Sequence, residues 1–124
     1  MRRGIPLSIA TDLASIHILA TVYKNKEKKA DFLKKTVTSL TQKVDYIDWA
    51  EIFFIKGEEC LLAVSNSKPG VKKEDLQSKL VFPITKGRKK LGYLVVKSRQ
   101  WIVFDVTDVS TLEKVANELG QHLY

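Results

Sequence analysis

The sequence predicts an α+β fold, in which an antiparallel sheet carries its helices on one face. Apolar residues recur at the spacing of amphipathic helices near both ends of the chain, at 8–23, 33–44 and 112–123. Between them lie two pairs of short apolar runs, at 49–64 and 80–96, each joined by a polar turn that contains glycine. Helices segregated from consecutive hairpins are typical of this class. With 124 residues, the chain is predicted to form a single domain, 1–124.

Two helices are predicted before the first hairpin. The first begins at Ser8, and its apolar stripe includes Ile9, Leu13 and Ile16. The polar run KNKEKK at 24–29 connects it to a second helix, whose stripe is Leu33, Val37, Leu40 and Val44. Because the connection is short, we expect the two helices to be adjacent and antiparallel.

The two hairpins form the predicted sheet. In the first, WAEIFFI at 49–55 is followed by CLLAV at 60–64, with Gly57 in the turn. In the second, LVFPI at 80–84 is followed by LGYLVV at 91–96. Side chains alternate between the faces of a strand, and both LGYLVV and WAEIFFI place apolar residues on each face. Both faces of the sheet therefore require cover.

The remaining segments are predicted from turn and cap signals. The polar stretch 65–79 is expected to be a loop with one helical turn around 74–77, and WIVF at 101–104 a further short strand or extended edge. Ser110 and Glu113 have the spacing of a capping box for the last helix, and Asp108 is a competing cap. The predicted buried stripe of this helix is Leu112, Val115, Ala116, Leu119 and Leu123.

The second hairpin resembles the signature hairpin of GAF domains, in which a strand ending in Val-Pro-Leu leads through a glycine-containing turn to Ile-Gly-Val-Leu. The matching positions are Phe82, Pro83, Ile84, Gly87, Leu91, Gly92 and Tyr93. The last helix is similar to the final helix of the family through Phe104, Asp108, Leu112 and Ala116. The resemblance implies a GAF-like fold of the profilin or PAS type.

The first hairpin resembles that of the small GAF proteins that reduce free methionine-(R)-sulfoxide. Trp49, Ala50, Lys56, Gly57 and Glu58 carry this match. In those reductases a long segment after the second strand carries the reactive cysteines, whereas 65–79 contains none. The single cysteine, Cys60, lies before that segment and has no second cysteine to resolve a sulfenic acid. We therefore expect no enzymatic activity, with a degenerate sulfoxide reductase as one alternative.

Other chemical sites are weakly supported. Cys60 is expected to be a structural, half-buried thiol, because its neighbours in the sequence are acidic rather than cationic. His17 and His122 are expected to be structural, since two ligands are too few for a zinc site. No catalytic motif or metal site is predicted, and the sequence names no cofactor.

The net charge of +7 and the basic turn of the second hairpin permit contact with an anion. The candidate contacts are Lys86, Arg88, Lys89 and Lys90. A nucleic-acid interface would also need exposed aromatic residues among the cations, and only Tyr93 and Trp101 are near. We expect the turn to be a solvated hairpin tip, with a basic protein that associates with nucleic acid as the other alternative.

The preferred hypothesis is a non-catalytic GAF-like domain that senses a small molecule or regulates through dimerisation. The family resemblance implies a ligand pocket on the outer sheet face, for which the candidate residues are Trp49, Phe53, Phe82 and Tyr93. A homodimer is expected through the first and last helices. We expect no signal peptide, because Asp12 and His17 interrupt the first apolar stretch, no contact with a membrane, and a location in the cytoplasm.

Overall fold

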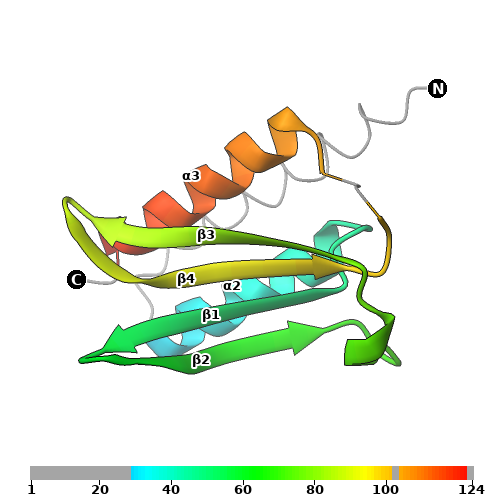
Figure 1. Ribbon diagram of the computed structural model, residues 1–124, viewed down its shortest axis with the longest axis horizontal. Coiled ribbons are helices and arrows are strands. Elements are labelled where there is room, and N and C mark those ends of the chain that lie inside the picture. Colours follow the sequence, from blue (N-terminus) through cyan, green and yellow to red (C-terminus); the bar gives the residue numbers. More distant parts are fainter. Residues whose placement is uncertain (1–28, 102–103, 123–124) are drawn as a thin grey trace.

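The computed structural model describes residues 29–101 and 104–122 of the chain. Its elements, in order, are α2 (Lys29–Lys43), β1 (Trp49–Lys56), β2 (Glu59–Ser67), the single 3₁₀ turn η1 (Lys73–Asp75), β3 (Ser78–Lys86), β4 (Lys89–Ser98) and α3 (Val106–His122). The strands form one four-stranded antiparallel sheet in the order β2-β1-β4-β3 (Figure 1). The α+β prediction is confirmed. The helix predicted at 8–23 lies outside the described residues.

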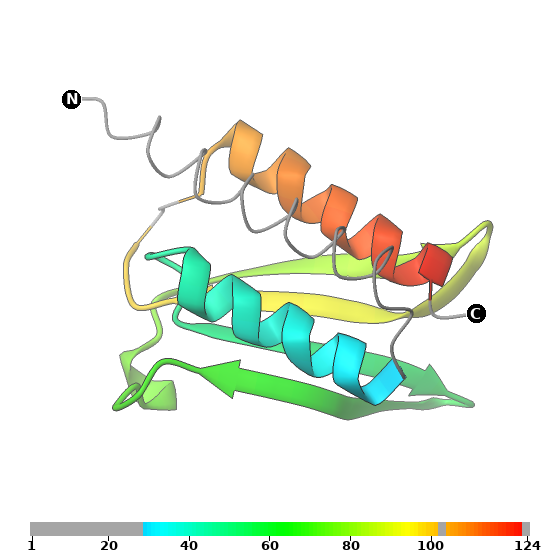
Figure 2. The same cartoon turned by 180° about the vertical axis from the view of Figure 1, so that it is seen from behind.

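Both helices lie on the same face of the sheet, which Figure 2 shows from the helix side. Between helices and sheet lies a continuous apolar core, in which Val37 and Leu40 of α2 and Leu112 and Leu119 of α3 are fully buried. The predicted stripes of the second and last helices are thus confirmed for their described residues. We call the opposite face of the sheet the outer face; no helix in the described ranges covers it.

The alternation of each strand decides which residues reach the outer face. In β1, Ala50 and Ile52 are fully buried in the core and Phe54 packs against it, so the residues between them point outward. The outward set is Trp49, Glu51, Phe53 and Ile55 in β1, Tyr93, Val95 and Lys97 in β4, Lys79, Val81 and Pro83 in β3, and Cys60, Leu62, Ser65 and Ser67 in β2.

Both hairpins form as predicted. Each tight turn begins with a glycine in the left-handed region, Gly57 with φ 65° and Gly87 with φ 62°, where other residues are strained. The two turns lie at the same end of the sheet, because β1 and β4 are antiparallel neighbours. The strands are longer than the apolar runs, since polar residues at their ends continue the ladder.

Two connections differ from the sequence prediction. The loop is shorter than 65–79, because residues 65–67 belong to β2 and 78–79 to β3, and its helical turn lies at Lys73–Asp75 rather than around 74–77. The predicted strand at 101–104 is not formed at Trp101 or Phe104, and 102–103 lie outside the described residues. The Phe104 ring instead meets Tyr46 edge to face, with centroids 5.4 Å apart.

The start of α3 also differs from the prediction. The helix begins at Val106, so Ser110 lies inside it and does not cap it. The amide of Asp108 donates to the Asp105 carboxylate at 2.8 Å, and the amide of Asp105 donates to the Asp108 carboxylate at 3.2 Å. This reciprocal pair is a capping box built from two aspartates. Asp108 therefore contributes to the cap, but from inside the first turn.

The α3 helix packs closely on the sheet at Gly120. A β-carbon at this position would overlap the backbone carbonyl oxygen of Thr85 in β3. The absence of a side chain therefore sets how closely the end of the helix packs on the second hairpin.

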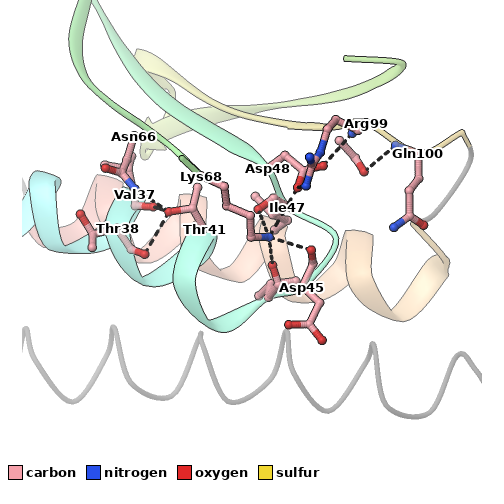
Figure 3. A network of polar contacts seen from close by, with 12 residues as sticks. Val37, Thr38, Thr41, Asp45, Ile47, Asp48, Asn66, Lys68, Arg99 and Gln100 are labelled. Atoms are coloured by element: carbon pink, nitrogen blue, oxygen red, sulfur yellow. Dashed lines mark hydrogen bonds and ion pairs between the residues drawn. The ribbon is translucent and has the colours of Figure 1, made fainter. Parts of the chain in front are cut away.

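The elements meet around Asp48, which precedes β1 and is 2% exposed. Its amide donates to the Lys97 carbonyl, and its carbonyl accepts from the Lys68 amide, both at 2.9 Å. Its carboxylate accepts from the amide and the guanidinium of Arg99, at 2.7 and 3.1 Å. One residue thus joins the ends of β2 and β4 to the start of β1 (Figure 3).

Lys68 extends this network to the end of α2. Its ammonium donates to the carbonyls of Val44, Asp45 and Ile47 at 3.0, 2.6 and 2.7 Å, and lies 3.6 Å from the Asp48 carboxylate. The three carbonyls follow the last turn of the helix, where cations are favoured. The Asn66 side-chain amide adds a 2.6 Å hydrogen bond to Thr41 of α2.

The charges in this network shift one another's pKa values. Burial by itself raises the pKa of Asp48, but the hydrogen bonds from Arg99 and the charges of Lys68 and Arg99 outweigh burial and lower that pKa below its usual value. Burial lowers the pKa of Lys68 against the opposing effect of Asp48. The Asp48 carboxylate raises the pKa of Arg99.

We predict that Asp48→Asn lowers the free energy of unfolding by about 2–4 kcal/mol, because it leaves two cations without their shared carboxylate. Asp45→Asn is the matched control: its side chain is exposed and its backbone carbonyl still accepts from Lys68. The control is expected to change stability by less than about 0.5 kcal/mol. Chemical denaturation measures both values, and equal losses in the two variants would contradict the role of Asp48.

We also predict that the stability difference between wild type and Asp48→Asn depends on pH. The pKa of Asp48 is lower in the folded than in the unfolded state, so its contribution is complete above the unfolded value of about 4 and is lost as the pH falls through the folded value. Denaturation at several pH values between neutral and acid checks this. A difference that stays constant throughout would show that the carboxylate charge is not responsible.

A third prediction concerns Gly120. Gly120→Ala is expected to destabilise the fold by about 1–3 kcal/mol despite the better helix propensity of alanine, because the added methyl group displaces α3 from β3. Asn117→Ala, at an exposed position of the same helix, is the control and is expected to be neutral or slightly stabilising. Thermal unfolding distinguishes the two, and a stabilised Gly120→Ala would refute the close contact.

Candidate functional site

The structure places three of the four predicted pocket residues together. Trp49 and Phe53 of β1 and Tyr93 of β4 lie on the outer face, where Phe53 is directly opposite Tyr93. The prediction of Phe82 is wrong in position: its side chain is 5% exposed and lies in the core beneath the helices. In β3 the outward positions are those on either side of Phe82, so the strand phase expected for this residue was wrong.

Rows of cross-strand neighbours divide the outer face into polar and apolar parts. At the end near Asp48, the row across the sheet is Ser67, Trp49, Lys97 and Lys79. In the next row, Val95 lies between Glu51 and Val81. The row beyond contains Phe53, Tyr93 and Pro83. The row with the two lysines is therefore followed by a mixed row, in which Glu51 lies beside two valines, and then by an apolar row.

Glu51 links the first two rows. Its carboxylate lies 3.2 Å from the Lys97 ammonium, and both side chains are largely removed from solvent, with exposed fractions of 9% and 22%. The pair is diagonal across β1 and β4, where long side chains reach each other. Glu51 therefore holds the Lys97 side chain down on the sheet.

A pocket of about 260 Å³ opens at the cationic end of this face. Its lining residues are Lys73, Leu76, Gln77, Ser78, Lys79 and Lys97. Ser78, Lys79 and Lys97 belong to the sheet, and the rest come from η1 and the residues that lead into β3. The amide of Gln77 donates to the Ser98 carbonyl at 2.8 Å, and the Ser78 hydroxyl donates to the Gln100 carbonyl at 2.7 Å. These bonds fix the wall of the pocket against β4.

Trp49 lies beside Lys97 in the cationic row. Within the described part of the chain, its indole nitrogen is buried and has no hydrogen-bond partner. A buried donor without an acceptor costs free energy, so an added acceptor at this position stabilises the folded state.

The basic turn forms a solvated tip, as expected. Lys86, Arg88, Lys89 and Lys90 are all exposed. The Lys90 ammonium lies 5.5 Å from the centre of the Tyr93 ring, a distance typical of a cation–π contact. The aromatic ring nearest to the tip is therefore already engaged, which disfavours base stacking there.

Cys60 differs from the prediction of a half-buried thiol, because it is exposed on edge strand β2. It pairs with Ile55, next to the hairpin turns, whereas the pocket lies at the other end of the sheet. Among residues 29–101 and 104–122, no three potential ligand side chains gather as a metal site. His17 lies outside the described residues, as does the side chain of His122.

The lysines of the pocket were missed by sequence analysis. Lys73, Lys79 and Lys97 are spread over three elements and come together only because η1 folds back toward the start of β3. Lys79 and Lys97 lie at strand ends next to apolar runs, and a lysine in a strand is expected to face solvent rather than the core. This signal predicts which face of the sheet the two lysines occupy, but not that they come together with Lys73 in one pocket.

No family model matches the sequence, and no curated protein matches it. Solved structures do match. One is fRMsr of Staphylococcus aureus in complex with substrate, with 16% identity, a TM-score of 0.77, and 92% of this chain and 95% of that chain covered. Another is the free methionine-R-sulfoxide reductase of Neisseria meningitidis in complex with its substrate, at 15% identity, a TM-score of 0.75, and 88% and 85% covered.

A third match comes from a different kind of protein. The GAF domain of a phosphoenolpyruvate-protein phosphotransferase from Coxiella burnetii is 15% identical, with a TM-score of 0.79 and 94% of each chain covered. None of the helices in the described part of the chain is long and apolar enough to cross a membrane. At these sequence identities the similarity shows the fold alone. It extends over nearly the whole length of this chain and of each matching chain. The chain therefore has the GAF fold.

Proposed function

We propose that this protein is a non-catalytic GAF-type module that binds a small molecule on the outer face of its sheet. The observation that carries the proposal is the pocket of about 260 Å³ between the start of β3 and η1, which opens beside an apolar sheet surface. Of that surface, Val81 is 48% exposed. Concave sites lined by apolar groups and a few polar ones are the usual form of ligand sites.

The position of the thiol supports a role without reductase chemistry. Thiol-dependent reduction of a sulfoxide requires the cysteine sulfur to reach the substrate, and a second thiol to resolve the cysteine sulfenic acid that forms when the thioether product leaves. Cys60 lies at one end of β2 and Ser67, in the row of the pocket, at the other. At the rise of an extended strand, these positions are roughly 20 Å apart. The sequence contains no other cysteine.

Regulation through a homodimer of the first and last helices stays a prediction, because the first of these helices lies outside the described residues. The cytoplasmic location likewise stays a prediction. Both are compatible with a module that binds its ligand on the face opposite α3.

Reductase activity is tested with free methionine-(R)-sulfoxide and dithiothreitol as reductant. We expect no methionine to form above the rate without protein, and the same result for Cys60→Ser. Turnover by the wild type that is lost in Cys60→Ser would overturn the non-catalytic proposal.

Ligand binding is tested by thermal shift with a panel of amino acids, nucleotides, carboxylic acids and amides. At least one class is expected to raise the melting temperature in a saturable manner, because binding to the folded state alone stabilises it. Leu76→Arg, which fills the pocket, should abolish the shift. Leu62→Arg, at an exposed position of β2, is the control and should retain it. A panel without any saturable ligand would refute the proposal.

A further inference from the structure

We infer that the pocket takes a small monocarboxylate with an alkyl or aryl group, whose carboxylate lies among the three lysines and whose apolar part lies on the sheet. This inference rests on the proposed function and adds the chemical class of the ligand. It is carried by two features that lie side by side on the outer face: a cationic pocket and an apolar surface.

The cationic part is only partly neutralised by the protein. Lys97 pairs with Glu51 at 3.2 Å, whereas Lys73 and Lys79 have no carboxylate within ion-pair distance among the described residues. The lining residues include three lysines and no acid. Like charges held in one concave site repel, and an anion between them removes this repulsion while accepting charge-assisted hydrogen bonds.

The apolar part begins one row further along the sheet. Lys97 and Lys79 are opposite each other, and two residues along their strands Val95 and Val81 are opposite each other. This separation is roughly 7 Å. Val81 is 48% exposed, so its side chain still has apolar area to lose on binding. An anion without an apolar group would bind to the lysines only, and the apolar surface at Val81 would remain exposed to solvent.

The volume of the pocket limits the size of the ligand that it can hold. A volume of about 260 Å³ lies just below the range typical of sites for drug-sized molecules. An acid of the size of 3-phenylpropionate therefore fits the site better than a nucleotide or a lipid with long chains. The rows on the sheet allow such an acid to lie along β4, from Lys97 towards Tyr93.

Calorimetric titration of the intact protein with 3-phenylpropionate tests the inference, with 3-phenylpropionamide and acetate as matched probes. The amide keeps the shape and loses the charge, and acetate keeps the charge and loses the ring. We expect saturable binding of the acid, and at least tenfold weaker binding of each of the other two. Raising the salt concentration should weaken binding of the acid, because the lysines are accessible to solvent.

Two variants with the same change of net charge locate the site. Lys79→Met in the pocket is expected to weaken binding of the acid about three- to fivefold, the effect of losing one partly exposed ion pair. Lys89→Met removes an equal charge at the hairpin tip, at the other end of the sheet, and should change affinity less than twofold. Thermal unfolding of both variants checks that they are folded.

The outcomes separate this inference from the proposed function. Equal binding of acid and amide, abolished by Leu76→Arg, would overturn the carboxylate assignment and leave the ligand pocket in place. Equal weakening by Lys79→Met and Lys89→Met would show unspecific attraction to a basic protein and would also overturn the assignment. No binding of the acid, the amide or any member of the thermal-shift panel would overturn both proposals.

Discussion

The position of Asp48 is the constraint on which the rest of the structure depends. Its backbone bonds to both neighbouring strands, and its carboxylate holds Arg99 beyond the end of β4, while Lys68 joins it to the carbonyls that follow α2. Three segments that are distant in the sequence, 44–48, Lys68 and 97–99, are thereby fixed at one end of the sheet. The residue that follows, Trp49, begins the row that contains Lys97, so the same constraint positions the candidate site.

The face opposite the helices is where the molecule differs most from a simple two-layer domain. The helices bury one face of the sheet. The outer face keeps apolar side chains at its surface, such as those of Val81 and Leu62. The short connection 68–77 covers only the corner occupied by the pocket. The exposed apolar area at Val81 lies next to the lysines of the pocket, and it is for this surface that ligand binding is proposed.

The candidate site was only partly predictable from the sequence. Trp49, Phe53 and Tyr93 do lie on the outer face, because alternate residues of β1 share a face and Phe53 pairs with Tyr93. Phe82 was assigned from its expected position in the strand, and the observed strand phase puts it in the core instead. The pocket lysines carry no motif. Their convergence depends on strand pairing and on the path of η1, and neither is encoded in any short window.

By itself, the sequence determined the local elements: the helix stripes, the two hairpins with Gly57 and Gly87 in their turns, and the alternation that assigns strand residues to faces. These follow from backbone preferences and periodicity, which act over a few residues. Only the tertiary structure decided the order β2-β1-β4-β3, the partners of Asp48 and the exposure of Cys60. These depend on which distant segments meet, and packing of the complete chain selects among pairings that local preferences leave equivalent.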